Sequence, residues 1–286
     1  MALLLSVLEQ GMIYGILALG VYITYKILDF PDLTVDGSFP FGAAITVRLI
    51  NGFGVPAILT LPIAFLGGAL VGICTGLIHV KLKVRDLLSG IIMMTGLYTI
   101  NLWVAGSGYV AIFDKDNIFN NNFVNSITPD FLVNFKNVII IFLITMVAKY
   151  LLDWYMSTKS GFLLRAVGDN DTIVTSLGVD KGLVKIVGLS IANGLVSLSG
   201  CIYAQQQRSF EISIGTGAVV IGLASVIIGT SLFKKVTFFR VTSSVVVGSI
   251  LYKACVAVAM FAGISPNAIK LITAVLFLII LVISMD

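Results

Sequence analysis

Apolar stretches of about 20 residues alternate with short polar segments along nearly the whole chain. A helix needs roughly 20 predominantly apolar residues to cross the hydrocarbon core of a bilayer. The stretches that meet this criterion are 6–28, 55–79, 87–105, 137–155, 183–204, 214–232, 241–262 and 268–284. The pattern therefore predicts an all-α fold, a polytopic membrane helix bundle of about 8–10 transmembrane segments.

A polar segment, 29–50, interrupts this pattern directly after the first apolar stretch. It carries three closely spaced carboxylates: Asp29, Asp32 and Asp36. Ser38 and Pro40 suit an N-cap and a first helical turn, so we expect a helix from Ser38 to Ile50. Such a helix would reach about 20 Å, short of the roughly 30 Å hydrocarbon core. Residues 29–50 are therefore predicted to form a broken or re-entrant element, which either lines a transport pathway or is a polar turn before a short, tilted span.

Basic residues are unevenly distributed among the connections between the predicted spans. Lysine and arginine gather in the loops 80–86, 156–182 and 233–240. They are scarce in the loops 106–136, 205–213 and 263–267. Because cytoplasmic loops are enriched in these residues, the first set and the C-terminus are predicted to be cytoplasmic, and the second set extracytoplasmic. The N-terminus is expected outside if 29–50 crosses the membrane and inside if it re-enters; the charges leave both arrangements open.

Composition narrows the class of protein further. Hydrophobic residues make up 58% of the 286 residues and charged residues only 11%, and the mean hydropathy is +1.06. These values exclude a soluble globule and a disordered chain, and the short connections leave no room for a separate catalytic domain. The cysteines lie singly within apolar runs, without the spacing of a metal or redox site. They are Cys74, Cys201 and Cys255.

Several polar residues fall at membrane depth. Lys253 lies near the middle of the span 241–262, where a cation is costly and should face the bundle interior with a partner. Asp32 and Asp36 are the candidate partners if the broken element dips inward. Neutral polar side chains would either line a pathway or bond a neighbouring helix. The candidate pathway or gate residues are Asp32, Thr34, Asp36, Ser38, Asn101, Asn193 and Lys253.

Small residues recur at a spacing of four in several spans. Gly68, Gly72 and Gly76 form the longest such series. Small residues let helix backbones approach closely in lipid, where the hydrophobic effect contributes little to helix association. The series indicates packing inside one bundle or, alternatively, an interface between two copies of the chain.

The basic loop 156–182 contains a second distinctive pattern. Asp169, Asn170 or Asp171 can cap a short helix, and Gly178 can end it. The result would be a short amphipathic helix between basic flanks, outside the bilayer. Such an element is shaped to dock into a groove on a cytoplasmic partner.

Three segments resemble the permease subunits of bacterial ATP-binding-cassette (ABC) importers, in the branched-chain amino acid and ribose permease superfamily. The first is LDFPDLTVDGSF, which contains Asp29–Ser38. The second is Gly161–Gly178, with its LRAVGDN core, and the third is Gly217–Gly229, which reads GAVVIGLASVIIG. Within the superfamily, the chain looks most like permeases that accompany tryptophan- or tyrosine-like binding lipoproteins. It lacks the EAA triplet of maltose-type permeases, since Thr172, Ile173 and Val174 stand there.

The resemblance implies one transmembrane permease domain over 1–286, with a cytoplasmic coupling loop, 156–182, and an extracytoplasmic loop, 106–136. It implies a multi-pass protein of the bacterial cytoplasmic membrane that forms a pathway, as a homodimer, for a small polar solute such as an amino acid. The implied partners are a second permease copy, a cytoplasmic ATPase dimer and an extracytoplasmic binding lipoprotein, with no nucleic acid. Residues implied in ATPase coupling are Arg165, Gly168, Asp169, Asn170, Asp171 and Gly178.

The resemblance gives this chain no catalytic, cofactor or metal-binding residue, because ATP and Mg²⁺ belong to the partner ATPase. The sequence has no Walker motif of its own. An ion-coupled secondary transporter is the alternative, although few acids lie within the predicted spans and no internal repeat is evident. A membrane-embedded enzyme would need a metal or nucleophile cluster, and the three aspartates of 29–38 have no histidine beside them.

Overall fold

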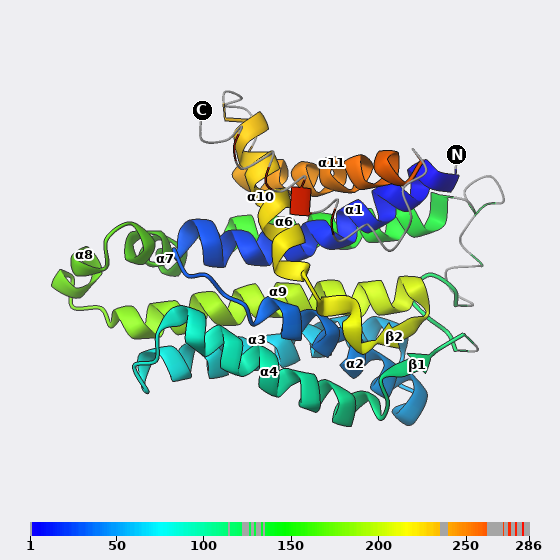
Figure 1. Cartoon of the computed structure of the whole chain (residues 1–286), viewed down its shortest axis with the longest axis horizontal. Coiled ribbons are helices and arrows are strands. Elements are labelled where there is room, and N and C mark those ends of the chain that lie inside the picture. The colour runs from blue at the N-terminus through cyan, green and yellow to red at the C-terminus, as the bar shows by residue number, and fades with distance from the viewer. Residues whose placement is uncertain are drawn as a thin grey trace.

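The computed structural model is a bundle of long helices with a small two-stranded sheet at one end (Figure 1). It describes residues 2–113, 115–121, 135–234 and 240–261, with a few single positions between 126 and 133 and after 270. The main helices are α1 (Ala2–Val21), α2 (Val35–Phe53), α3 (Thr60–Val80), α4 (Asp86–Ala105), α6 (Lys136–Met156), α9 (Lys181–Gln207), α10 (Ala218–Leu232) and α11 (Val241–Phe261). A π-helical turn, Tyr22–Ile27, extends α1, and 3-10 turns, Ala57–Leu59 and Ile212–Gly215, precede α3 and α10.

Seven of the described helices are long and apolar enough to cross a membrane. They correspond to the first seven predicted spans, so the prediction of an all-α polytopic bundle is confirmed. The eighth predicted span, 268–284, lies largely outside the described residues.

The break after the first span lies earlier than predicted. The helix α2 begins at Val35 and contains 19 residues, so the prediction that Ser38 caps it was wrong. Asp32 instead forms the turn that precedes the helix, because its Oδ1 accepts a hydrogen bond from the backbone N–H of Thr34 at 2.9 Å. At 1.5 Å per residue α2 extends about 28 Å, so it is not the short helix expected. The non-helical part of the element is the stretch 28–34.

The two ends of the bundle carry different elements (Figure 1). The strands β1 (Tyr109–Ala111) and β2 (Ser209–Glu211) pair antiparallel at one end, and the N-terminus lies there too. The short helices α7 (Lys159–Asp169) and α8 (Asp171–Ser176) lie at the opposite end. The stretch 28–34 leads from the α7–α8 end into the bundle, and α2 continues to the β1–β2 end. Segment 28–53 therefore runs the length of the bundle. The N-terminus and α8 lie at opposite ends of it (Figure 1).

Helix α9 is the centre of the core and packs against α1, α2 and α3. A Cβ on Gly72 of α3 would lie 2.2 Å from the carbonyl oxygen of Leu189, and one on Gly68 would lie 2.3 Å from that of Asn193. A Cβ on Gly76 would lie 2.9 Å from the side chain of Ile186. All three glycines of the α3 series therefore face α9 of the same chain rather than a second copy.

Candidate functional site

A fully buried polar network surrounds the break between α1 and α2. The Oδ2 of Asp32 accepts a hydrogen bond from Asn193 Nδ2 of α9 at 2.8 Å. The hydroxyl of Ser38 donates to Asn193 Oδ1 at 2.6 Å, and the hydroxyls of Thr34 and Thr75 lie 3.1 Å apart. These residues are at most 5% exposed. The network fixes the break to α3 and α9, because an unpaired polar group at this depth would be costly.

Asp36, in the first turn of α2, holds the start of α10. Its two carboxylate oxygens accept hydrogen bonds from the backbone N–H groups of Gly217 at 3.0 Å and Val219 at 2.8 Å. A carboxylate at a helix N-terminus satisfies orphan donors and complements the positive end of the helix dipole. Gly217, with φ of 84°, allows the chain to turn into α10 here. Two of the three resemblance segments, around Asp36 and Gly217, thus meet at one contact.

A pocket of about 380 Å³ lies beside this contact, between the first turns of α2, the middle of α4 and the turn before α10. Asn101 of α4 lines it and is fully buried. The Nδ2 of Asn101 donates to the carbonyl oxygen of Gly37 at 3.1 Å. The other lining residues are Asp36, Gly37, Pro40, Met94, Thr95, Tyr98, Ile212, Ser213 and Thr216. Of the seven candidate pathway residues, the pocket therefore brings together Asp36 and Asn101.

Lys253 does not pair with Asp32 or Asp36, contrary to expectation. Its Nζ lies 3.6 Å from the centre of the Tyr14 ring of α1. Within the described part of the chain, no carboxylate oxygen lies within 4.0 Å of this ammonium. Asp32 and Asp36 instead accept hydrogen bonds from backbone N–H groups and from Asn193. The aromatic face of Tyr14 can stabilise the ammonium of Lys253 in place of a carboxylate.

The predicted short helix in the basic loop is present as α8, and α7 precedes it. The Oδ1 of Asn170 accepts from the N–H of Thr172 at 3.1 Å, so Asn170 is the residue that caps α8. Gly178, with φ of 75°, ends this helix. Asp169, Asn170 and Arg165 are exposed, and α8 lies outermost at its end of the bundle (Figure 1).

Helix α7 is fixed to the bundle by its apolar face. Leu164 and Val167 are buried, and Gly168 lies directly against the π-helical turn that ends α1. A Cβ on Gly168 would lie 1.7 Å from the carbonyl oxygen of Ile27. At Gly168, α7 therefore contacts the junction between α1 and the stretch 28–34 with no room for a side chain.

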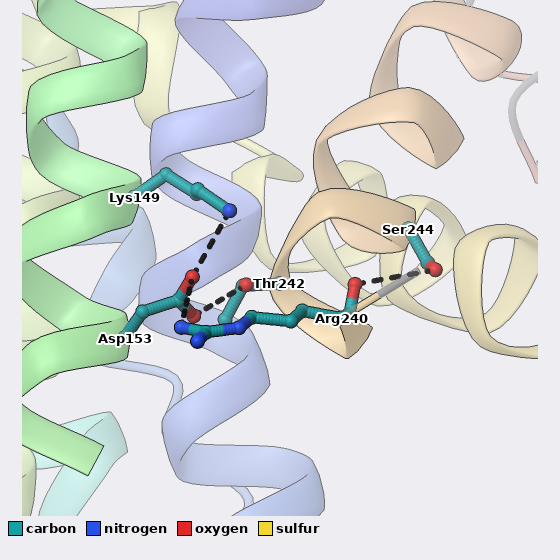
Figure 2. Close-up of polar contacts among 5 residues, drawn as sticks. All are labelled: Lys149, Asp153, Arg240, Thr242 and Ser244. Carbon is teal, nitrogen blue, oxygen red and sulfur yellow. Dashed lines mark hydrogen bonds and ion pairs between the residues drawn. The ribbon is translucent and has the colours of Figure 1, made fainter. Parts of the chain in front are cut away.

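An ion cluster, which the sequence analysis missed, joins α6 to the start of α11 (Figure 2). Its Lys149 and Asp153 side chains are buried and its Arg240 side chain is exposed. Asp153 Oδ2 lies 3.0 Å from Lys149 Nζ and 3.3 Å from Arg240 Nη1. Thr242 Oγ1 donates to Asp153 Oδ1 at 2.6 Å. The signal was present in the sequence, because Lys149 and Asp153 stand four residues apart inside the apolar stretch 137–155.

Replacing Asp153 by asparagine should destabilise the protein far more than replacing Arg240 by alanine. The side chain of Lys149 is only 9% exposed and would lose its counter-charge, which costs about 3–5 kcal/mol. The side chain of Arg240 is 69% exposed, and such pairs contribute about 0–1 kcal/mol. Thermal aggregation of the detergent-solubilised protein measures the difference. Equal shifts of the midpoint for the two variants would contradict this assignment.

Comparisons with known proteins agree with the resemblance found in the sequence. A family model described as the permease component of the branched-chain amino acid transport system matches residues 3–282. The tyrosine transport system permease protein of Clostridioides difficile (strain R20291) is 41% identical over 276 residues, which cover 96% of this chain and 89% of that protein. The probable branched-chain amino acid transport permease LivH of Methanocaldococcus jannaschii is 26% identical, covering 75% and 70% of the two chains. The ribose import permease RbsC of Escherichia coli (strain K12) is 26% identical, covering 79% and 68%. No solved structure matches the chain.

Proposed function

Because the chain belongs to the family of branched-chain amino acid transport permease components, we propose that it forms the membrane pathway of an importer driven by a separate ATPase. The chain is a permease component of an ABC transport system, and its substrate is consistent with an amino acid. The observation that carries the ATPase partnership is the α7–α8 segment. Helix α8 lies outermost at its end of the bundle and is capped at both ends, and α7 is tied through Gly168 to the interior break.

The proposed substrate is L-tyrosine or a similar amino acid, delivered by an extracytoplasmic binding protein. The support is the 41% identity to a permease named for tyrosine transport, over nearly the whole of both chains. The more distant relatives are named for branched-chain amino acids and ribose. The binding protein in this type of importer would supply most of the selectivity.

The proposed orientation puts the α7–α8 end in the cytoplasm of a bacterial cell, with the permease in the cytoplasmic membrane. The connections at that end include the basic loops around Lys81, Lys83 and Arg85 and around Lys159 and Arg165. Cytoplasmic loops are enriched in such residues. The N-terminus would then be extracytoplasmic. The C-terminus, which lies outside the described residues, would be cytoplasmic.

A second, identical permease would complete the pathway. Helix α4 lines the 380 Å³ pocket and is among the least buried of the spans, with Tyr98 and Trp103 exposed. Two copies that meet near this face would enclose the pocket between them. ATP and Mg²⁺ would be bound by the ATPase pair, whose closure would move α8 of each permease.

The first test is co-purification of the tagged permease, mildly solubilised, from cells that express its neighbouring genes. We expect a stoichiometric ATPase and a binding protein, and L-tyrosine uptake by the complex in liposomes. A permease that is purified without an ATPase, yet carries out gradient-driven uptake, would contradict the proposal.

Reversing the charge of Arg165 should uncouple the ATPase from transport. Arg165 is exposed on α7 beside the proposed docking helix. We expect Arg165→Glu to lower the ATPase stimulation by loaded binding protein at least about fivefold, corresponding to a coupling of about 1 kcal/mol. Arg165→Lys keeps the positive charge at this exposed position and should leave most of the stimulation intact. Wild-type stimulation in Arg165→Glu would remove this residue from the coupling surface.

A further inference from the structure

The side-chain carbonyl of Asn101 is an unused acceptor in the interior of the protein. Asn101 is fully buried, and its Oδ1 meets no donor in the part of the chain that the structure describes. The amide cannot simply be reversed, because Oδ1 would then face the carbonyl oxygen of Gly37, which Nδ2 now contacts at 3.1 Å. Buried acceptors are nearly always paired, so this oxygen points to a missing donor.

The pocket that Asn101 lines has the chemistry of a site for a hydrogen-bond donor with positive charge. It contains the carboxylate of Asp36 and the hydroxyl groups of Thr95, Tyr98 and Thr216. None of the described residues that line it is lysine, arginine or histidine. Its volume of about 380 Å³ falls in the range of small-ligand pockets, which is about 300–1,000 Å³.

We propose that this pocket receives the ammonium group of the transported amino acid, with the Asp36 carboxylate as its first acceptor. Asn101 Oδ1, which the surrounding side chains cover in this structure, becomes the second acceptor when the ligand displaces them. The inference rests on the proposed function, since it assigns a subsite on the proposed pathway. Each oxygen of Asp36 already accepts one backbone N–H group of α10 and retains a further lone pair for an ammonium. Met94, Tyr98 and Ile212 supply apolar surface for the remainder of the substrate.

The position of Asp36 links ligand binding to helix α10. Its carboxylate holds the start of α10, so an ammonium bound there shares this carboxylate with the helix. A bound amino acid would therefore contact α2, α4 and the turn before α10 at once. Water alone could also donate to Asn101, and the experiment separates these two occupants.

Two analogues of tyrosine, each with only one of its two charged groups, distinguish an ammonium site from any other pocket. Tyramine has the amine without the carboxylate, and 3-(4-hydroxyphenyl)propionate has the carboxylate without the amine. The reporter is the labelling rate of Thr95→Cys by a maleimide in the complete permease–ATPase complex, reconstituted in nanodiscs. The exposed Cys74 and Cys255 are replaced by alanine for this purpose.

We expect tyramine at millimolar concentration to slow labelling at least about tenfold, and the propionate to have no effect. Asn101→Leu should abolish the protection by tyramine. Ser249→Ala is the matched control, because Ser249 is equally buried and donates to the backbone oxygen of Gly11 at 2.8 Å, away from the pocket. It should leave protection intact.

Equal protection by both compounds, or by neither, would overturn the proposal, as would full protection in Asn101→Leu. The comparison of the two compounds uses the native Asn101, so it remains decisive if Asn101→Leu fails to fold. Uptake of L-tyrosine by the same complex distinguishes failure of the subsite from failure of the proposed function. Normal uptake without protection by tyramine rejects the subsite alone, whereas absence of any amino acid uptake rejects the proposed function.

Discussion

Replacing Gly168 by alanine is expected to reduce substrate uptake at least about tenfold, within the usual range of coupling energies between two sites. The added Cβ would lie 1.7 Å from the carbonyl oxygen of Ile27. A backbone atom cannot rotate away as a flexible side chain does, so α7 must move off the π-helical turn. The contact through which, on the proposed function, α7 and α8 would act on the interior break would be lost. Uptake and ATPase activity of the reconstituted complex measure the effect.

Two other glycines provide controls for this variant. Gly96, on α4, has no atom within 4 Å of the position of its missing Cβ, so Gly96→Ala should be neutral. Gly178→Ala introduces a strained φ of 75° after α8 but no clash, and it should weaken coupling less than Gly168→Ala. The permease should be recovered from membranes in equal amounts in all three cases. Wild-type uptake by Gly168→Ala would show that this contact does not position the coupling segment.

Local patterns were sufficient to predict much of the fold. Hydropathy over about 20 residues located the seven described spans, because the bilayer imposes both length and composition. The end of α8 at Gly178 also depends only on nearby residues. The start of α2 was missed because Ser38 resembled a cap, whereas Asp32 forms the turn.

Contacts between distant segments could not be predicted in this way. Asp36 lies 181 residues before Gly217, whose N–H it accepts, and nothing in either segment alone specifies that pairing. Lys253 was expected beside a carboxylate on the basis of charge, but helix packing brings it to Tyr14. The function itself came from resemblance rather than from residue chemistry, since side chains that line a pathway and those that bond helices look alike in a sequence.

Exchanging Asp32 and Asn193 should restore much of what either single substitution destroys. Both carboxylate oxygens of Asp32 accept a hydrogen bond, one from Thr34 N–H and one from Asn193 Nδ2. In Asp32→Asn, an NH₂ group replaces one of these oxygens, so it faces another donor. In Asn193→Asp, two carboxyl groups meet in a buried site. Each single variant should lose about 1–3 kcal/mol, and more where a charge is left unpaired.

The double variant restores complementary donors and acceptors. Asparagine at position 32 can donate to aspartate at 193 and still accept from Thr34, while the second oxygen at 193 accepts from Ser38. The bond from position 193 to the carbonyl oxygen of Leu189, at 3.1 Å, is lost, and a carboxylate oxygen then faces that carbonyl oxygen, so the rescue is incomplete. Thermal midpoints of all four proteins in detergent form a double-mutant cycle, with Thr145→Val as a control for the loss of one buried hydroxyl. Simple additivity of the two single effects would mean that the pair does not act as a unit in holding the break to α9.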